Sequence, residues 1–524
     1  MPEAENAVAA KAGAMRCNGR AEIRADYESV DEDNLWKILS EALPAFEVNK
    51  AQILYLWNYY KGVQPILERV KEVRPEINNK VVENHAQEIV SFKVGYQLAE
   101  PLQYTLRDHE GTSCPDGSDE ETEASYDEHA RDLNELNTLM HAADKAESDR
   151  DLFEYLCVCG IGHRMVEASP NGAECPFELH VLDPWSTFVV YSSAYHRRPL
   201  MAVWVGREQD GSKHDIYNVY TDEHRYLVRP GGQIVEKLPH TYGAIPIVEY
   251  RLNRVRMGAF EPVLPLLDAI NAIESNRLDG IEQTVQSLMK FVNCEIDEET
   301  FERMLSLGAV KVSSPEGLKS DVDFIRNDLD QSQTQVTKDD LYQAVVNISG
   351  MPNRQSGGGS TSDTGAAVML RDGWTLAETH AKNYELNFKR SERAMLSLVL
   401  GICKQAAGVS VDLRLRDIEL TFSRRNYENV QVKAQVLTTM LASGQIHPEI
   451  AFKSCGMFTD PESAYLQSKR WAEEKASENE AKALEIASAQ GAADEGEPDP
   501  VGSSAGVPEP GKGDDAAAHA AANA

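Results

Sequence analysis

One change in hydrophobic periodicity constrains the fold of this chain more than any other feature. From Asp151 to Arg251, short segments rich in Val, Ile, Tyr and Phe alternate with period two, and turn signals such as Asp210-Gly211 separate them. Helical spacing then takes over, with apolar residues three and four positions apart at Leu278, Ile281, Val285, Leu288 and Val292. An antiparallel sheet followed by a long helix predicts an α+β chain.

The long helix needs packing partners. Counted from Gly258, the helical run of about 32 residues spans roughly 48 Å at 1.5 Å per residue. Pro262 and Pro265 suit its first turns. A helix of this length with one apolar stripe must pack against neighbours along its whole length. Those neighbours belong either to the same chain or to an adjacent subunit.

The rest of the chain alternates helices with short inserts. Residues 30–106 are mostly helical. After the long helix we expect a compact insert with a short acidic helix and two strands, then a helix, a Gly-Ser loop and another long helix. The strand in LRDIELTFSRR and helices near 428–443, 448–454 and 462–485 complete the chain.

The net charge limits how the chain meets nucleic acid. Asp and Glu total 84 against 52 Lys and Arg, a formal net charge of −32 in 524 residues. Such a chain does not hold DNA through a general basic surface, although it is free to touch DNA without holding it. Carboxylates concentrate in residues 108–128 and 477–524, which we interpret as a solvated loop and a disordered tail.

The sequence contains no recognisable catalytic, nucleotide or metal motif. It has no GxxxxGK[ST], no GxGxxG after a strand, no HExxH and no GxSxG. Cys157 and Cys159, predicted to lie on a strand near His163 and Cys175, are better explained as buried thiols than as zinc ligands. The pairs at Glu120-Glu121 and Glu298-Glu299 resemble solvated faces. We therefore expect no enzyme activity, no cofactor and no metal.

The cellular setting follows from what the chain lacks. No run of about 18 apolar residues predicts a membrane span, and the N-terminus has no signal-like apolar run. The eight scattered cysteines indicate free thiols and not a disulfide framework. These features predict a chain made in a cytoplasm.

Four strings, in order, resemble the portal protein, or head-to-tail connector, of siphophage-type tailed bacteriophages. The first is YYKGVQPILER with NNKVVENHAQEIVSFKVGYQLAEPLQY (78–104), and the second is HTYGAIPIVEYRLNR (240–254) before the long helix. The third is NISGMPN with its Gly-Ser loop and long helix, and the fourth is IELTFSRRNYEN with GQIHPEIAFKSCGMFTDPESA. The resemblance covers about residues 50–475. An unusually long acidic insert at 108–128 and His447-Pro448 depart from the pattern.

The resemblance implies a portal fold with a wing of helices and antiparallel strands, a long-helix stem, a small α/β clip and a helical crown. The implied division is an N-terminal arm (1–49), wing (50–257), stem helix (258–293), clip (294–330), second stem helix (331–348), tunnel loop (349–365), wing long helix and strand (366–424), crown (425–476) and disordered acidic tail (477–524).

The resemblance also implies a function. About twelve subunits would form a ring at one capsid vertex, the channel for packaging and ejecting double-stranded DNA. Implied partners are the terminase large subunit, major capsid and scaffolding proteins, and a head-completion or adaptor protein. The protein would belong to the virion and assemble in the host bacterial cytoplasm.

Three groups of site residues follow. The stem would contact the next subunit through Leu278, Ile281, Val285 and Leu288. The clip would face terminase or adaptor with Glu298, Glu299, Glu302 and Arg303. The tunnel loop would meet DNA through Arg354, Gln355, Ser356, Gly357, Gly358, Gly359 and Ser360.

Two alternatives remain open. One is an acidic α+β enzyme of an unrecognised family, which predicts a small oligomer with a pocket. The other is a different ring-forming virion protein such as an adaptor, although adaptors are usually much shorter than this chain.

Overall fold

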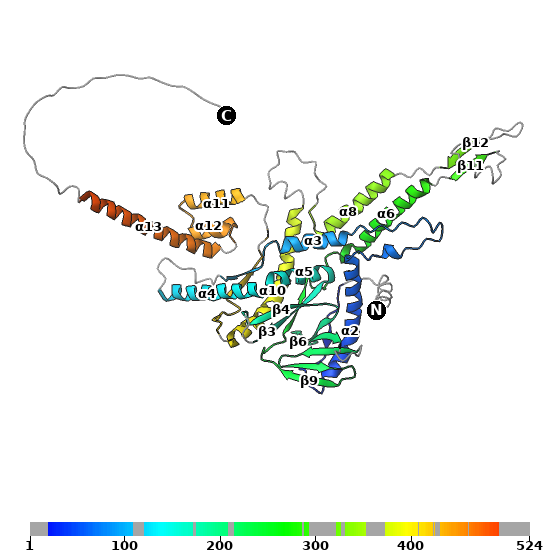
Figure 1. Cartoon of the computed structure of the whole chain (residues 1–524). Helices are drawn as coiled ribbons and strands as arrows, with labels where there is room; N and C mark the ends of the chain where they lie inside the picture. The colour runs from blue at the N-terminus through cyan, green and yellow to red at the C-terminus, as the bar shows by residue number, and fades with distance from the viewer. Residues whose placement is uncertain are drawn as a thin grey trace, which may run out of the picture. The chain divides into compact units, whose positions relative to one another are not determined.

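The computed structural model describes residues 19–107, 120–170, 174–207, 214–285, 288–292, 321–325, 331–352, 373–406, 408–422, 424, 430–458 and 461–491. The chain divides into two compact units, residues 1–432 and 433–524. Helices and mainly antiparallel strands share the first unit, which confirms the α+β class (Figure 1).

The largest sheet lies against a helix from the N-terminal part. Its strand order is β1 (Arg24–Ala25), β5 (Thr187–Ser192), β6 (Pro199–Arg207), β7 (Asp215–Tyr220), β8 (His224–Val228) and β9 (Ile234–Pro239). Only the β1–β5 pair is parallel. Helix α2 (Leu35–Tyr60) packs its apolar side on this sheet, where the Phe46 and Phe188 rings stack with centroids 4.3 Å apart. The predicted arm–wing boundary after residue 49 therefore cuts through one helix.

A second sheet lies at the centre of the main core. Strands β10 (Ile247–Arg251), β3 (Ile161–Ala168) and β4 (Phe177–Leu182) form it, in that order. Helices α3 (His85–Gln97), α5 (Lys145–Cys159) and α10 (Trp374–Gln405) belong to the same apolar core, and α5 and α10 contact this sheet. Beside it, β2 (Gln103–Leu106) pairs with β13 (Ile418–Thr421), and α4 (Glu120–Ala142) contacts β2.

A helix pair with a small hairpin completes the first unit. The 3-10 turn η2 (Glu261–Val263) leads directly into α6 (Leu264–Val285), which packs against α8 (Gln331–Ser349). A second 3-10 turn, η1 (Pro65–Glu68), also contacts α6. Strands β11 (Leu288–Val292) and β12 (Asp321–Ile325) pair antiparallel between these helices in the sequence. The second unit contains α12 (Pro448–Cys455) and α13 (Pro461–Gly491), with most of α11 (Val430–Ala442).

Two predicted elements are wrong in type. Leu288 and Val292 lie in β11 and not in the long helix, which ends at Val285. A spacing of four residues suits both a helix and a strand, and pairing with β12 decides for the strand. Cys157 and Cys159 end helix α5 instead of lying on a strand, because Leu152 and Leu156 continue a helical stripe and Gly160, at φ +79°, terminates it.

The two acidic segments also differ from expectation. Residues 120–128, predicted as loop, begin α4, whose later turns bury Leu133, Leu136 and Met140. Their Glu-rich sequence favours a helix once an apolar stripe follows. In the second unit, α13 continues to Gly491, so the helix extends well past Ser477, where the tail was predicted to begin.

Candidate functional site: the α6–α8 helix pair

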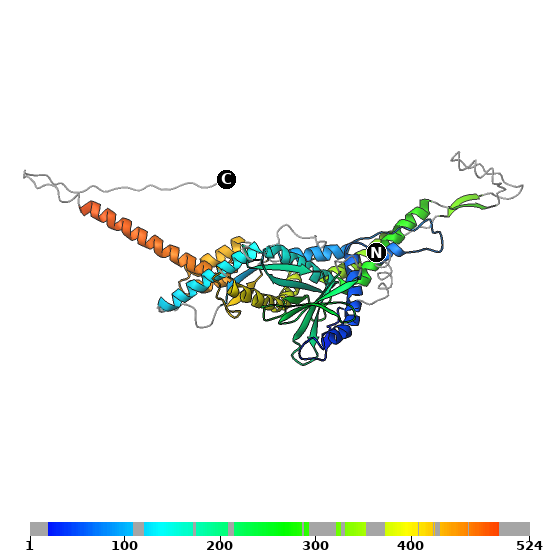
Figure 2. The same cartoon turned by 60° about the horizontal axis from the view of Figure 1, so that its bottom comes forward.

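Helices α6 and α8 lie side by side in both views (Figures 1 and 2). Polar contacts tie them together. Arg277 Nη1 donates to Gln335 Oε1 at 3.0 Å, and Lys338 Nζ lies 2.8 Å from Glu274 Oε1. The same ammonium lies 2.6 Å from Glu83 Oε1, so a third segment, from the N-terminal half of the chain, joins the pair.

That third segment runs along α6 in register. The backbone N–H groups of Asn79, Val81 and Glu83 donate to the side chains of Asp279, Ser275 and Asn271, at 2.8, 3.0 and 2.8 Å. Every second residue of an extended chain advances about 6.6 Å, and every fourth residue of a helix about 6 Å. The two spacings nearly match, so polar side chains on one face of α6 accept hydrogen bonds from alternate backbone N–H groups of the segment.

Asp279 anchors the distal end of this ladder. Its carboxylate also pairs with Arg69 at 3.1 Å and Lys71 at 2.9 Å. Burial opposes ionisation here, but hydrogen bonds from Lys71 and Asn79 hold the pKa of Asp279 below its usual value. One buried carboxylate therefore orders the segment that follows η1.

His85 closes the proximal end, where the segment becomes α3. Its two ring nitrogens lie 2.9 Å from Glu88 Oε2 and 3.0 Å from Glu83 Oε2, and Tyr342 of α8 donates to Glu88 Oε1 at 3.0 Å. Burial lowers the pKa of His85, yet the hydrogen bonds to Glu88 and Glu83 raise it above its usual value overall. When protonated, this imidazole stabilises Glu88, the carboxylate that accepts the hydrogen bond from Tyr342 of α8.

Three apolar side chains of the pair are only partly covered by the described residues. Leu278 and Ile281 of α6 are 41% and 46% exposed, and Val336 of α8 is 59% exposed. Near the core the same helices bury Leu267, Ile270 and others completely or nearly so. The pair thus changes along its length from a core element to a surface with exposed branched side chains.

The predicted site residues have different outcomes. Leu278 and Ile281 lie on α6 as expected, Val285 is its last residue, and Leu288 belongs to β11. The clip residues (Glu298, Glu299, Glu302 and Arg303) and the tunnel-loop residues (Arg354, Gln355, Ser356, Gly357, Gly358, Gly359 and Ser360) lie outside the described residues. Sequence reasoning missed the ladder on Asn271, Ser275 and Asp279, although their four-residue spacing was visible.

The structure also bears on the zinc site and the membrane span that the sequence analysis considered. Within the described ranges, no group of three or more His, Cys, Asp or Glu side chains is placed to hold a metal ion. Cys157, Cys159 and Cys175 are buried free thiols, and burial raises the pKa of Cys157 to about 12, which disfavours the thiolate that zinc needs. Among the described helices, none is long and apolar enough to cross a membrane.

Comparison with known proteins identifies the class. The family model described as "Phage portal protein, SPP1 Gp6-like" matches residues 41–481, which include the β10–β3–β4 sheet and the helix pair. The chain therefore belongs to this family of phage portal proteins, which are structural and non-enzymatic components of the virion. Family membership implies an oligomeric ring associated with the capsid.

Other comparisons add little. No curated protein shows a significant match. A chain of the solved structure "Virion of native gene transfer agent (GTA) particle" is 14% identical, with a TM-score of 0.43, over 78% of this chain and 93% of that chain. The family match disfavours the enzyme alternative raised by the sequence.

Proposed function

We propose that about twelve copies of this chain form a closed ring at one capsid vertex, through which double-stranded DNA is packaged and ejected. The observation that supports it best is the α6–α8 pair, whose two helices are joined by ion pairs. Leu278, Ile281 and Val336 on this pair are exposed, and a neighbouring subunit could cover them. A contact between one face of the pair and a different face of the next copy is heterologous, and such contacts form a closed ring when the rotation from copy to copy completes a full turn.

The charge of the chain suits a channel that lets DNA slide. Near the pair, the cations Arg69, Lys71 and Lys338 are already engaged by carboxylates. Exposed lysines and arginines lining a tunnel would hold phosphates and slow the movement of DNA. A ring of subunits that each carry a net charge of −32 offers weak repulsion instead.

The remaining roles are assigned by segment. Residues 294–330, with Glu298, Glu299, Glu302 and Arg303, form the clip that docks the terminase large subunit during packaging and a head-completion or adaptor protein afterwards. Residues 349–365 form the tunnel loop, where Arg354 offers one transient phosphate contact per subunit. Major capsid and scaffolding proteins surround the ring during assembly in the host bacterial cytoplasm.

The ring contact is tested by placing charge on the exposed stripe. The unaltered protein should form a particle of roughly 700 kDa by native mass spectrometry, from about twelve subunits of 58.1 kDa. Leu278→Asp with Ile281→Asp should leave monomers or incomplete oligomers, because two desolvated carboxylates per contact are costly.

A matched control uses two other exposed apolar residues. Val235 and Leu238 on β9 are 45% and 44% exposed, so Val235→Asp with Leu238→Asp adds the same charge to a similar surface outside the pair. These rings should form normally. Full rings from the Leu278 and Ile281 variant would show that the stem contact lies elsewhere.

A further inference from the structure

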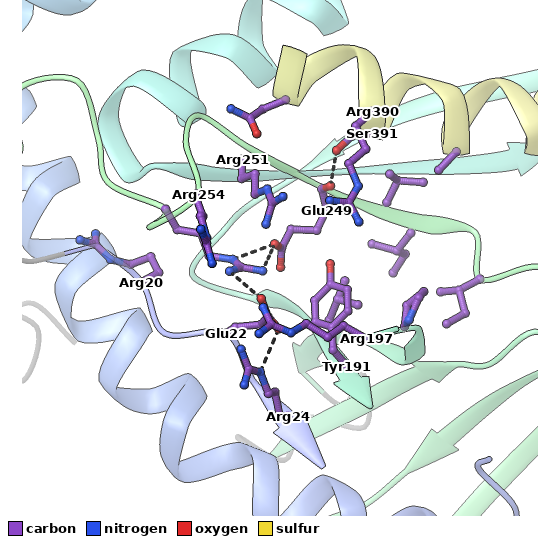
Figure 3. Close-up of a pocket in the computed structure, with 18 of the residues that line it drawn as sticks. Arg20, Glu22, Arg24, Tyr191, Arg197, Glu249, Arg251, Arg254, Arg390 and Ser391 are labelled. Carbon is purple, nitrogen blue, oxygen red and sulfur yellow. Dashed lines mark hydrogen bonds and ion pairs between the residues drawn. The ribbon is translucent and has the colours of Figure 1, made fainter. Parts of the chain in front are cut away.

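A large cavity in the first unit lies apart from the helix pair. It has a volume of about 1030 Å³ and is enclosed by residues 19–24, the β5–β6 hairpin, β10 with the turn after it, and one side of α10 (Figure 3). Seven arginines and two glutamates line it, with no lysine or aspartate. Such an excess of positive charge stands out in a chain whose net charge is −32.

The buried arginines of the cavity are already neutralised. Arg256 lies 2.8 Å from Glu249 and 3.2 Å from Glu22, and Arg20 lies 2.6 Å from Glu261. Arg24 and Arg197 also pair with Glu22, at 2.9 and 4.0 Å. Each of the two lining glutamates therefore already has at least one arginine partner.

Three arginines remain without a carboxylate in the described part of the chain. Arg251 and Arg254 come from β10 and the turn after it, and Arg390 comes from α10 (Figure 3). Burial and the positive charges of Arg256 and Arg390 together lower the pKa of Arg251. Like charges gathered in a partly desolvated concavity favour binding of an anion.

The walls of the cavity narrow the class of anion. Val189, Ile245, Val248 and Leu398 give it an apolar side, and Ser391 and Asn387 add polar groups. A bare phosphate uses no apolar wall, and duplex DNA presents its phosphates on a convex cylinder that does not enter a concave pocket. The volume is at the upper end of the range for ligand pockets, which suits several residues of peptide.

We propose that this cavity binds a short carboxylate-rich peptide segment, whose acidic side chains pair with Arg251, Arg254 and Arg390. Guanidinium groups bind carboxylates through two parallel hydrogen bonds, which fixes orientation as well as adding affinity. The segment comes from a second copy of this chain. Residues 108–128 of this chain, with nine carboxylates and no Lys or Arg, have the required chemistry.

The test measures binding of a labelled peptide with the sequence of residues 108–128 to the full-length protein, by fluorescence anisotropy at low salt. Saturable binding is expected, weakening as salt rises. Arg254→Gln with Arg390→Gln should weaken it at least tenfold; both side chains are exposed, so folding should be retained. A peptide with all nine carboxylates changed to amides should not bind.

The control variant is Arg393→Gln with Arg416→Gln, which removes the same charge from exposed positions outside the cavity. It should bind the peptide as tightly as the unaltered protein. Absence of saturable binding, or equal affinity in the two arginine variants, would overturn the proposal. Binding of inorganic phosphate or a short oligonucleotide with the same arginine dependence, but not of the peptide, would also overturn it.

Two further measurements test where the bound segment comes from and whether the cavity acts independently of ring formation. Deleting residues 108–119 from the full-length chain should raise the affinity for the added peptide, because a second copy then competes less for the cavity. An unchanged affinity would overturn the second copy as the source of the segment. The proposal does not depend on the ring. The Arg254 and Arg390 variant should still give the full particle mass, so failure of either idea is visible independently.

Discussion

The sheet-rich body and the α6–α8 pair treat their charged and apolar side chains in opposite ways. The body places four charged groups in its core, each at most 5% exposed, and balances them within the chain. The pair places its ion pairs where their cations are about one-fifth exposed and leaves Leu278 and Ile281 uncovered. The body therefore balances its charges in a buried network, whereas the pair balances them nearer the surface, beside partly exposed apolar side chains.

The core network shows what completeness requires. Lys145 Nζ lies 2.6 Å from Asp149 and 2.8 Å from Glu392, and Arg164 lies 2.6 Å from Asp149 and 3.5 Å from Glu392. The hydroxyls of Tyr104 and Tyr250 donate to Glu392 at 2.7 and 2.6 Å. These residues come from α5, β3, α10, β2 and β10, so the network joins five elements.

The largest effect should come from removing one charge of this network. Burial opposes ionisation, but Lys145 and Arg164 hold the pKa of Glu392 at about 2. Glu392→Gln leaves a buried excess of positive charge and should cost about 3–5 kcal/mol in the free energy of unfolding. Urea unfolding, followed by circular dichroism, measures the loss.

The matched control is Glu419→Gln. Glu419 is 54% exposed and lies 3.8 Å from Lys389, so its removal should cost less than about 1 kcal/mol. If the two variants lose similar stability, the contrast between a balanced core and an ordinary surface pair does not hold.

A smaller effect should appear as acid sensitivity of the body. His163 on β3 is fully buried, and neither ring nitrogen has a hydrogen-bond partner among the described residues. Burial, aided by the positive charge of Arg256, lowers the pKa of His163 to about 3. The unfolded chain takes up a proton near pH 6.5 and the folded chain does not, so stability is full above pH 6.5 and falls as pH drops towards 3.

The expected slope is about 1.4 kcal/mol per pH unit inside that window. His163→Leu should remove it, whereas His180→Leu, at a half-exposed position on β4, should leave it in place. Unfolding midpoints measured at pH 6.5 and 5.5 test this. A slope that survives in His163→Leu would mean that other groups carry the acid sensitivity.

A still smaller effect is expected at the joint between the two regions. Asp279→Asn keeps an oxygen for the N–H of Asn79 but removes the charge that holds Arg69 and Lys71. Because both cations are partly exposed, the loss should be about 1 kcal/mol. It should appear as faster hydrogen exchange in residues 69–83, with β3 and β10 unchanged. Equal acceleration in those strands would mean that the joint and the body unfold together.

The sequence predicted local elements better than the contacts between them. It placed the second helix of the pair at 331–348 against the observed Gln331–Ser349, because polar and apolar periodicity there has one interpretation. It failed at Leu288 and Cys157, where the apolar spacing fits two periods and pairing with distant residues decides. The ladder on α6 and the arginine cavity escaped prediction because each joins segments far apart in the chain, more than 180 residues for Asn271 and Glu83.

The smallest effect on the single chain should come from the exposed stripe itself, and this sharpens the comparison most. Ile270 and Ile281 lie on the same helix, one fully buried and the other 46% exposed. Ile270→Ala should cost about 2–5 kcal/mol because it leaves a cavity in the core. Ile281→Ala should change the unfolding free energy of the dissociated chain by less than about 0.5 kcal/mol, because nearly half of its side chain is exposed. Dilution to the monomer, checked by sedimentation, followed by urea unfolding measures both. If the proposed stem contact buries Ile281, Ile281→Ala should also raise the concentration at which rings dissociate. A large stability loss from Ile281→Ala in the monomer would place its packing partner within the same chain. The proposed contact between subunits through Ile281 would then be wrong.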